Sequence, residues 1–222
     1  KGAKKKAAER FFEIGRIYED QKSWVKMIKH YTQFLKKYQR SADLELVIRA
    51  YAKIGRGHWA QADAAFADYV RRNQKGDKPI EHIRSKNFWG RFNKAAKRSK
   101  AAYKTAYEKF VSARKRKKLA KPSKRLLDAV AESRFRVGEV LFFDFYYGSK
   151  LQAKTFKNPK KFAKKMTSEI KKRGGSVLAI TKVYDEVLTM GSATWSIAAL
   201  TRSGQMRALL AKEIDNYPAP KL

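Results

Sequence analysis

The chain has 222 residues, with 53 Lys and Arg against 20 Asp and Glu, and its formal net charge is +33. Apolar residues make up 43% and aromatic residues 13%, a composition too apolar for a disordered basic tail, so we expect a folded protein. The absence of cysteine excludes a disulfide scaffold, a thiolate zinc site and a cysteine nucleophile. Lys or Arg interrupts every apolar stretch before the roughly 18 residues of a membrane span, so no integral membrane span is expected.

Apolar stripes at helical spacing run through the N-terminal third, which begins at Lys1 rather than Met, as expected for a processed form or an excised fragment. Polar or glycine-containing segments at 20–23 and 55–57 are predicted to divide these stripes into helices of about 15 residues. Short connections favour opposite directions for neighbouring helices. The stripes are Phe11, Ile14, Ile17 and Tyr18; Met27, Ile28, Tyr31, Phe34, Leu35 and Tyr38; Leu44, Val47, Ile48, Tyr51 and Ile54; and Ala62, Ala65, Phe66 and Tyr69.

Helical patterns continue to the end of the chain. A turn is predicted at 76–79, a basic helical stretch follows over 88–111, and 121–123 breaks the chain again before an apolar helix over 126–147. Asn158 and Pro159 are typical of a helix start, 174–175 of a kink or an interruption, and 193–214 of a last helix. Because strand alternation with hairpin turns is absent from the sequence, the predicted fold class is all-α.

The positive charge is concentrated in two segments. Residues 84–125 hold 17 Lys and Arg with Glu108 as the single acidic residue, and residues 150–173 hold 10 with Glu169. Such charge favours an anionic partner through counterion release, although charged runs are often solvated faces that only aid solubility. The candidate anionic-partner residues are Arg114, Lys115, Arg116, Lys117, Lys118, Lys121, Lys124 and Arg125, and Lys157, Lys160, Lys161, Lys164 and Lys165.

Glycines recur within the helical stripes. The triplet Ile-Gly-Arg occurs around Gly15 and again around Gly55, 40 residues later, and related pairs occur at Gly90, Gly138 and Gly204. A glycine inside a helix costs about 1 kcal/mol relative to Ala. Repeated glycines therefore indicate close helix–helix approach, as in stacked helical hairpins.

On these residues the chain resembles the tetratricopeptide repeat (TPR) family over 7–72 and, less fully, over 126–217. Phe11, Ile14, Gly15 and Tyr18 are similar to the signature of helix A, and Met27, Tyr31 and Phe34 to that of helix B. The second unit keeps Ile54 and Gly55 with His58 at the Tyr position, and a unit around Gly90 has Asn93 there. In a further unit at Leu200, Gly204 and Arg207, only the glycine matches the TPR signature well. The proposed repeat-packing residues are Gly15, Tyr18, Gly55, Gly138 and Gly204.

The resemblance implies an α-solenoid of antiparallel hairpins that binds proteins without catalysis. Three parts are expected: N-terminal hairpins over 1–75, a basic helical segment with long helices over 76–121, and C-terminal helices over 122–222 with a basic insertion at 150–175. The segments 194–200 and 217–220 also resemble the C-terminal ends of TPR-like cell-envelope proteins of gliding and predatory bacteria. That likeness implies the bacterial envelope or periplasm, whereas nucleic-acid binding would imply the cytoplasm.

The sequence offers little for catalysis. Residues 55–60 match the glycine spacing of a dinucleotide-binding loop, but they follow a helical stripe rather than a strand, and Gly55 is explained by packing. His30, His58 and His82 have no second ligand at metal-binding spacing; His58 is expected in the repeat core and the other two at the surface. We therefore predict a protein that is not an enzyme and has no cofactor, metal site or catalytic residue.

Two functions remain open. The first is a non-catalytic protein-interaction scaffold whose basic faces dock an acidic protein or another anionic polymer. The alternative is sequence-independent nucleic-acid binding through the 84–125 basic block, with Phe88, Trp89, Phe92 and Tyr103 as stacking platforms, although their spacing favours a core role. Binding to an anionic membrane surface is less favoured, because the basic helices lack a separate apolar face.

Overall fold

The computed structural model describes residues 2–74, 76, 80, 83–148 and 159–216, and in them it contains seven helices and no strand. The predicted all-α class is confirmed. The helices are α1 (Gly2–Asp20), α2 (Trp24–Tyr38), α3 (Leu44–Asn73), α4 (Lys86–Lys115), α5 (Lys124–Tyr147), α6 (Pro159–Leu188) and α7 (Ala193–Asp215).

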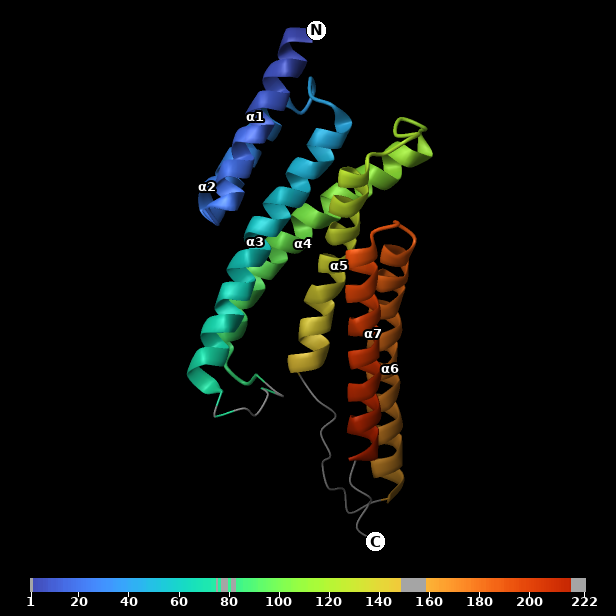
Figure 1. The fold of residues 1–222 in the computed structure, drawn as a ribbon. Coiled ribbons are helices and arrows are strands. Elements are labelled where there is room, and N and C mark those ends of the chain that lie inside the picture. Colours follow the sequence, from blue (N-terminus) through green and yellow to red (C-terminus); the bar gives the residue numbers. More distant parts are fainter. Residues whose placement is uncertain (1, 75, 77–79, 81–82, 149–158, 217–222) are drawn as a thin grey trace.

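Successive helices run in opposite directions, and each packs against the next (Figure 1). The odd-numbered helices also pack on one another in the order α1, α3, α5 and α7, whereas the even-numbered helices pack mainly on their sequence neighbours, and α4 reaches α6 through the hydrogen bond of Tyr107 to Glu186. The odd-numbered helices therefore form the continuous inner row of the molecule, and α5 stands between α3 and α4 on one side and α6 and α7 on the other.

Two apolar clusters fill the space between the helices. The smaller joins α1, α2 and the start of α3, and the larger extends from α3 to α7. Phe88, Phe92 and Tyr103 lie in the larger cluster, and Trp89 is half-buried with its indole Nε1 donating to the Ile83 carbonyl at 2.9 Å. The preference for a core role of these aromatic residues is confirmed, and Phe88, Phe92 and Tyr103 cannot stack on a base.

The predicted break at 55–57 is wrong, because α3 continues through these residues as one helix of 30 residues. Both glycines are buried there, and a Cβ added to Gly57 would lie 2.6 Å from Cγ1 of Ile28 on α2. These glycines therefore admit neighbouring side chains to the helix backbone instead of ending the helix. The expected interruption at 174–175 is also wrong, since α6 is likewise continuous over 30 residues.

A glycine of one helix faces a tyrosine ring of the next at three places. In each pair an added Cβ would come within 2.5 to 2.7 Å of the ring, closer than van der Waals contact allows. The tyrosine lies on the even-numbered helix and the glycine on the odd-numbered helix before it. The pairs are Gly15 with Tyr31, Gly55 with Tyr103, and Gly138 with Tyr184.

These contacts predict opposite effects for two glycine substitutions. Gly138→Ala should lower the free energy of unfolding by about 2 kcal/mol, because the new methyl group overlaps the buried Tyr184 ring. Gly90→Ala should raise it by up to about 1 kcal/mol, because an added Cβ there meets nothing within 4 Å and Ala is the better helix former. Urea unfolding followed by circular dichroism measures both. Equal effects at the two positions would contradict this account of Gly138.

Candidate functional site

The first predicted cluster forms an exposed basic corner where α4 ends and α5 begins. We define the basic corner as Arg114, Lys115, Arg116, Lys117, Lys118, Lys121, Lys124 and Arg125, all of which are exposed. None of these cations forms an ion pair with a carboxylate of the described residues. The corner therefore presents eight positive side chains to solvent.

The end of α4 fixes the backbone of the corner. The Lys118 amide donates to the Ala113 carbonyl at 2.9 Å and the Lys117 amide to the Arg114 carbonyl at 3.0 Å, which is the Schellman pattern of a helix C-terminus. Lys117 occupies its left-handed position with φ of 55°, where glycine is favoured and other residues are strained. Lys117 thus occupies a position at which the backbone conformation alone would favour glycine.

Two side chains attach the corner loop to the rest of the fold. The Arg114 guanidinium donates to the carbonyls of Leu119 and Ala120, each at 2.9 Å. The Glu45 carboxylate at the start of α3 accepts hydrogen bonds from the Ser123 amide at 3.0 Å and the Ser123 hydroxyl at 2.7 Å. Arg114 therefore supports the loop, while the neighbouring cations at 115–118 remain available to a partner.

Shallow hollows lie on both sides of Arg116. Glu108 lines both of them; Lys115, Arg134 and Glu186 also line one, and Lys109 and Lys118 the other. Both are open to solvent, a shape that suits a large partner better than an enclosed small ligand, and in each the cations outnumber the carboxylates. The Tyr107 hydroxyl donates to Glu186 at 2.5 Å, and burial together with this carboxylate raises the pKa of Tyr107 to about 12, so it stays protonated at neutral pH.

The second predicted cluster lies at the first turns of α6. Lys160, Lys161 and Lys164 are exposed, Lys165 is half-buried and pairs with Glu169 at 3.7 Å, and Lys157 lies outside the described residues. Figure 1 places this end of α6 at the opposite end of the molecule from the α4–α5 connection. The two clusters are therefore separate surfaces.

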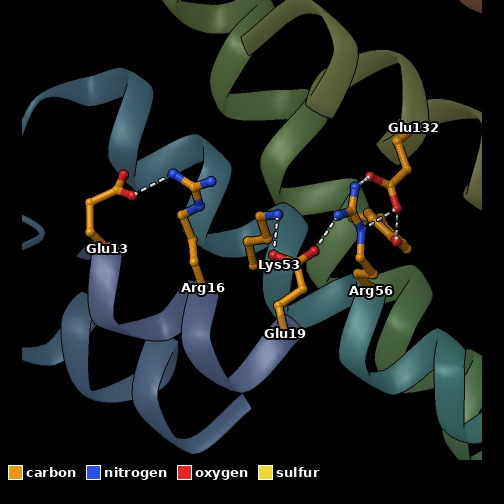
Figure 2. Close-up of polar contacts among 7 residues, drawn as sticks. Glu13, Arg16, Glu19, Lys53, Arg56 and Glu132 are labelled. Atoms are coloured by element: carbon orange, nitrogen blue, oxygen red, sulfur yellow. Dashed lines mark hydrogen bonds and ion pairs between the residues drawn. The ribbon is translucent and has the colours of Figure 1, made fainter. Parts of the chain in front are cut away.

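A buried ion network that the sequence analysis missed joins α1, α3 and α5 (Figure 2). The carboxylate of Glu132 is only 2% exposed; it accepts from Arg56 Nε at 2.9 Å and pairs with its terminal nitrogen. Arg56 also pairs with Glu19, which accepts from Lys53 at 2.5 Å. The Tyr103 hydroxyl completes the environment of Glu132 with a 2.9 Å hydrogen bond.

A second network repeats this arrangement two helical turns along α5. The carboxylate of Glu139 is 1% exposed and accepts from Arg202 Nε at 2.9 Å and from the Tyr184 hydroxyl at 3.0 Å. The signal in the sequence was a pair of carboxylates, seven residues apart, within a strongly apolar helix. Because both carboxylates already accept arginine and tyrosine donors, we interpret them as structural groups instead of acid–base catalysts.

The pKa directions follow from this burial. Burial by itself would raise the pKa of Glu19, but hydrogen bonds and positive charge from Lys53 and Arg56 outweigh it, so its pKa falls below the ordinary 4.5. Burial beside Glu132 raises the pKa of Tyr103, and burial beside Glu139 raises that of Tyr184. Both tyrosines therefore remain hydrogen-bond donors throughout the physiological range.

The other residues singled out in the sequence, which are two repeat-packing positions and the three histidines, differ in their burial. Gly204 on α7 is exposed, and an added Cβ there would meet nothing within 4 Å. Tyr18 and His58 are half-buried, and His58 contacts Gln61. The expectation of a surface position is wrong for His30, which is buried, stacks on Phe11 at 4.3 Å and donates from Nε2 to the Phe11 carbonyl at 2.6 Å. His82 lies outside the described residues.

Comparison of the chain with known protein families, with curated proteins and with solved structures finds no match. Within the described part of the chain, none of the helices is long and apolar enough to cross a membrane. In the same residues His, Asp and Glu side chains form no group of three or more that could hold a metal ion.

The lowered pKa of Glu19 predicts a pH-dependent stability difference. Glu19→Gln should reduce the free energy of unfolding by about 2 kcal/mol at neutral pH, because Lys53 and Arg56 lose a charged hydrogen-bond acceptor. Since the native pKa of Glu19 lies below 4.5, the contribution is complete above that pH and is lost as the pH falls through the native pKa. Wild type and variant should therefore converge in acid, as chemical denaturation from pH 7 to 3 would show.

A matched control is Glu13→Gln, which removes an exposed carboxylate paired with Arg16 on the same helix. This change should alter stability at neutral pH by less than about 0.5 kcal/mol. A constant difference between Glu19→Gln and wild type down to pH 3 would contradict the role of the Glu19 charge.

The left-handed backbone at Lys117 gives a separate prediction. Lys117→Gly should raise the free energy of unfolding by about 1 kcal/mol, because glycine adopts this conformation without steric cost. Lys118→Gly removes the same charge at a position that is not left-handed and should give no such gain. Thermal unfolding of the two variants separates the backbone effect from the charge effect, and equal melting temperatures would rule out strain at Lys117.

Proposed function

We propose that the protein is a non-catalytic interaction scaffold of the TPR-like α-solenoid type whose basic corner docks an acidic protein or another anionic polymer. The observation that carries the proposal is the display of eight exposed cations at the corner without carboxylate partners in the described residues. Elsewhere, by contrast, Glu132 and Glu139 are fully engaged inside the fold. The positive charge of the corner is thus left for a partner.

The helix packing supports the solenoid part of the proposal. Contacts between successive helices, and between alternate helices along one row, are the pattern of stacked hairpins that bury their apolar faces only against neighbours. The recurring glycine–tyrosine contact between odd and even helices supports a repeated unit. Such arrays offer extended rigid surfaces, which suits docking of a macromolecule.

Nucleic-acid binding is the second candidate, favoured by further exposed cations earlier on α4, the helix that leads into the corner. Lys94, Lys97 and Arg98 are exposed on this helix and could contact phosphates without reading sequence. Three of the aromatic side chains that could have stacked on single-stranded bases are buried in the core, which argues against a single-strand platform. If the exposed cations of α4 and the corner bind nucleic acid, the phosphate backbone of a duplex is therefore a better ligand for them than a single strand.

Neutralising the corner tests the proposal. A variant with Lys115, Arg116, Lys117 and Lys118 changed to Gln should bind labelled polyglutamate about tenfold more weakly at ~50 mM salt, because several counterions are no longer released. Arg114 is kept because its side chain holds the loop carbonyls. Fluorescence anisotropy with the full chain, between ~50 and 200 mM salt, measures both affinity and salt dependence.

The control variant carries the same charge change away from the corner, with the exposed lysines Lys26 and Lys29 on α2 and Lys171 and Lys172 on α6 changed to Gln. It should bind polyglutamate within about threefold of wild type, because those lysines lie outside the corner. Equal losses in the two variants would show a general charge effect and contradict a site at the corner. Tighter binding of a random duplex than of polyglutamate, lost in the corner variant, would favour the nucleic-acid alternative.

A further inference from the structure

The outer face of α7 carries an uncharged stripe of small and aliphatic residues. Its members recur at intervals of three or four residues, so they share one face of the helix, and all of them are exposed. Ile197 is 66% exposed and Leu200 58% exposed. In a chain of net charge +33, an exposed face without charged side chains is a candidate contact surface for another helix. We call it the α7 stripe: Ala193, Ile197, Leu200, Gly204, Ala208 and Ala211.

The corresponding positions on the other odd-numbered helices are buried. Seven residues before the packing glycine, Ala8 on α1, Ile48 on α3 and Ala131 on α5 are each 0% exposed, whereas Ile197 occupies that position on α7. Four residues after the glycine, Trp59 and Phe142 are buried on α3 and α5, whereas Ala208 is exposed. The α7 stripe is therefore the same face that the fold covers on α1, α3 and α5.

What covers the glycine on those three helices is a tyrosine of the following helix. Tyr31, Tyr103 and Tyr184 each lie over the glycine of the preceding odd-numbered helix. At Gly204 the equivalent space holds no described atom within 4 Å of an added Cβ. The α7 stripe thus has the geometry that receives an even-numbered helix, and no helix of the described residues occupies it.

We propose that the α7 stripe docks an acidic amphipathic helix of another protein, which places a tyrosine or phenylalanine ring over Gly204. The ring follows from the three internal contacts, in which glycine makes room for an aromatic side chain. The acidic character follows from the net charge of +33 and from Arg207, which is exposed and whose helical spacing places it along one edge of the stripe. The same charge opposes a second copy of this chain as occupant.

The inference rests on the proposed function, since it assumes that the protein binds other proteins, but it uses a surface separate from the basic corner. The probe is a fluorescein-labelled, helix-stapled peptide with the α2 sequence Trp24–Tyr38 in which the lysines are replaced by Glu. This peptide keeps the aromatic side that covers Gly15 in the protein and carries the opposite charge. A second peptide, with Ala in place of the tyrosine that corresponds to Tyr31, shows whether the ring is required.

Three variants of the full chain test the docking geometry. Gly204→Ala should weaken peptide binding at least about fivefold, because the methyl group fills the space for the ring, while the free protein becomes slightly more stable. Leu200→Glu should abolish binding, because it places an acidic group in the apolar contact and repels the acidic peptide. Gly90→Ala, the matched control on α4, should bind like wild type, since it gains the same helix propensity far from the stripe.

Four results would overturn the inference. The first is equal binding of the peptide to wild type and to Leu200→Glu, and the second is equal binding of the two peptides to wild type. The third is a concentration-dependent dimer in sedimentation that Leu200→Glu dissociates, since the occupant would then be a second copy. The fourth is a loss of stability in Gly204→Ala, since the chain would then cover its own stripe.

The corner variant separates this inference from the proposed function. If neutralising residues 115–118 abolishes peptide binding while Leu200→Glu leaves it intact, the peptide binds the basic corner, and only the assignment of the α7 stripe fails. If the corner variant keeps full affinity for polyglutamate, the proposed role of the corner fails, whatever the result at α7.

Discussion

The fold depends on two buried carboxylates of α5, because each one joins this helix to a pair of helices on one side of it. Each carboxylate accepts a hydrogen bond from the tyrosine of an even-numbered helix and an ion pair from the arginine of an odd-numbered helix. Removing any single donor would leave a buried charge incompletely paired, which is costly in a low-dielectric interior. The donors are Tyr103 and Arg56 for Glu132, and Tyr184 and Arg202 for Glu139.

Some of the few carboxylates of the chain serve the fold instead of neutralising surface cations. Carboxylates that could have neutralised surface cations are used inside, as Glu132 and Glu139 are, or to tie one element to another, as Glu45 ties α3 to the corner loop. The corner cations therefore face solvent without carboxylate partners among the described residues. The surface is strongly positive because the chain has 53 Lys and Arg against 20 Asp and Glu, and such a surface fits a partner of opposite charge.

The sequence predicted the features that depend on local spacing and missed those that depend on distant pairs. Helical periodicity was enough for the all-α class and for the core role of Phe92 and Tyr103. The sequence supported both a helix break at 55–57 and a packing role for Gly55, because a glycine in sequence does not show whether it ends a helix or admits a neighbour, and the Tyr103 ring decides for packing. The contact of Arg56 with Glu132 spans 76 residues, and no local pattern connects such positions.

The two candidate surfaces differ in the physics by which they would act on a partner. The basic corner works over distance and is screened by salt, so it raises the rate of encounter with anything acidic but discriminates poorly. The α7 stripe would act only at van der Waals distance. The open space at Gly204 would accept an aromatic ring, and exposed aliphatic side chains such as Leu200 would pack against that ring only if its shape fits. A partner that carries both an acidic surface and an aromatic helix would satisfy both requirements. Selection would then come from the short-range contact, since shape complementarity discriminates where charge alone does not.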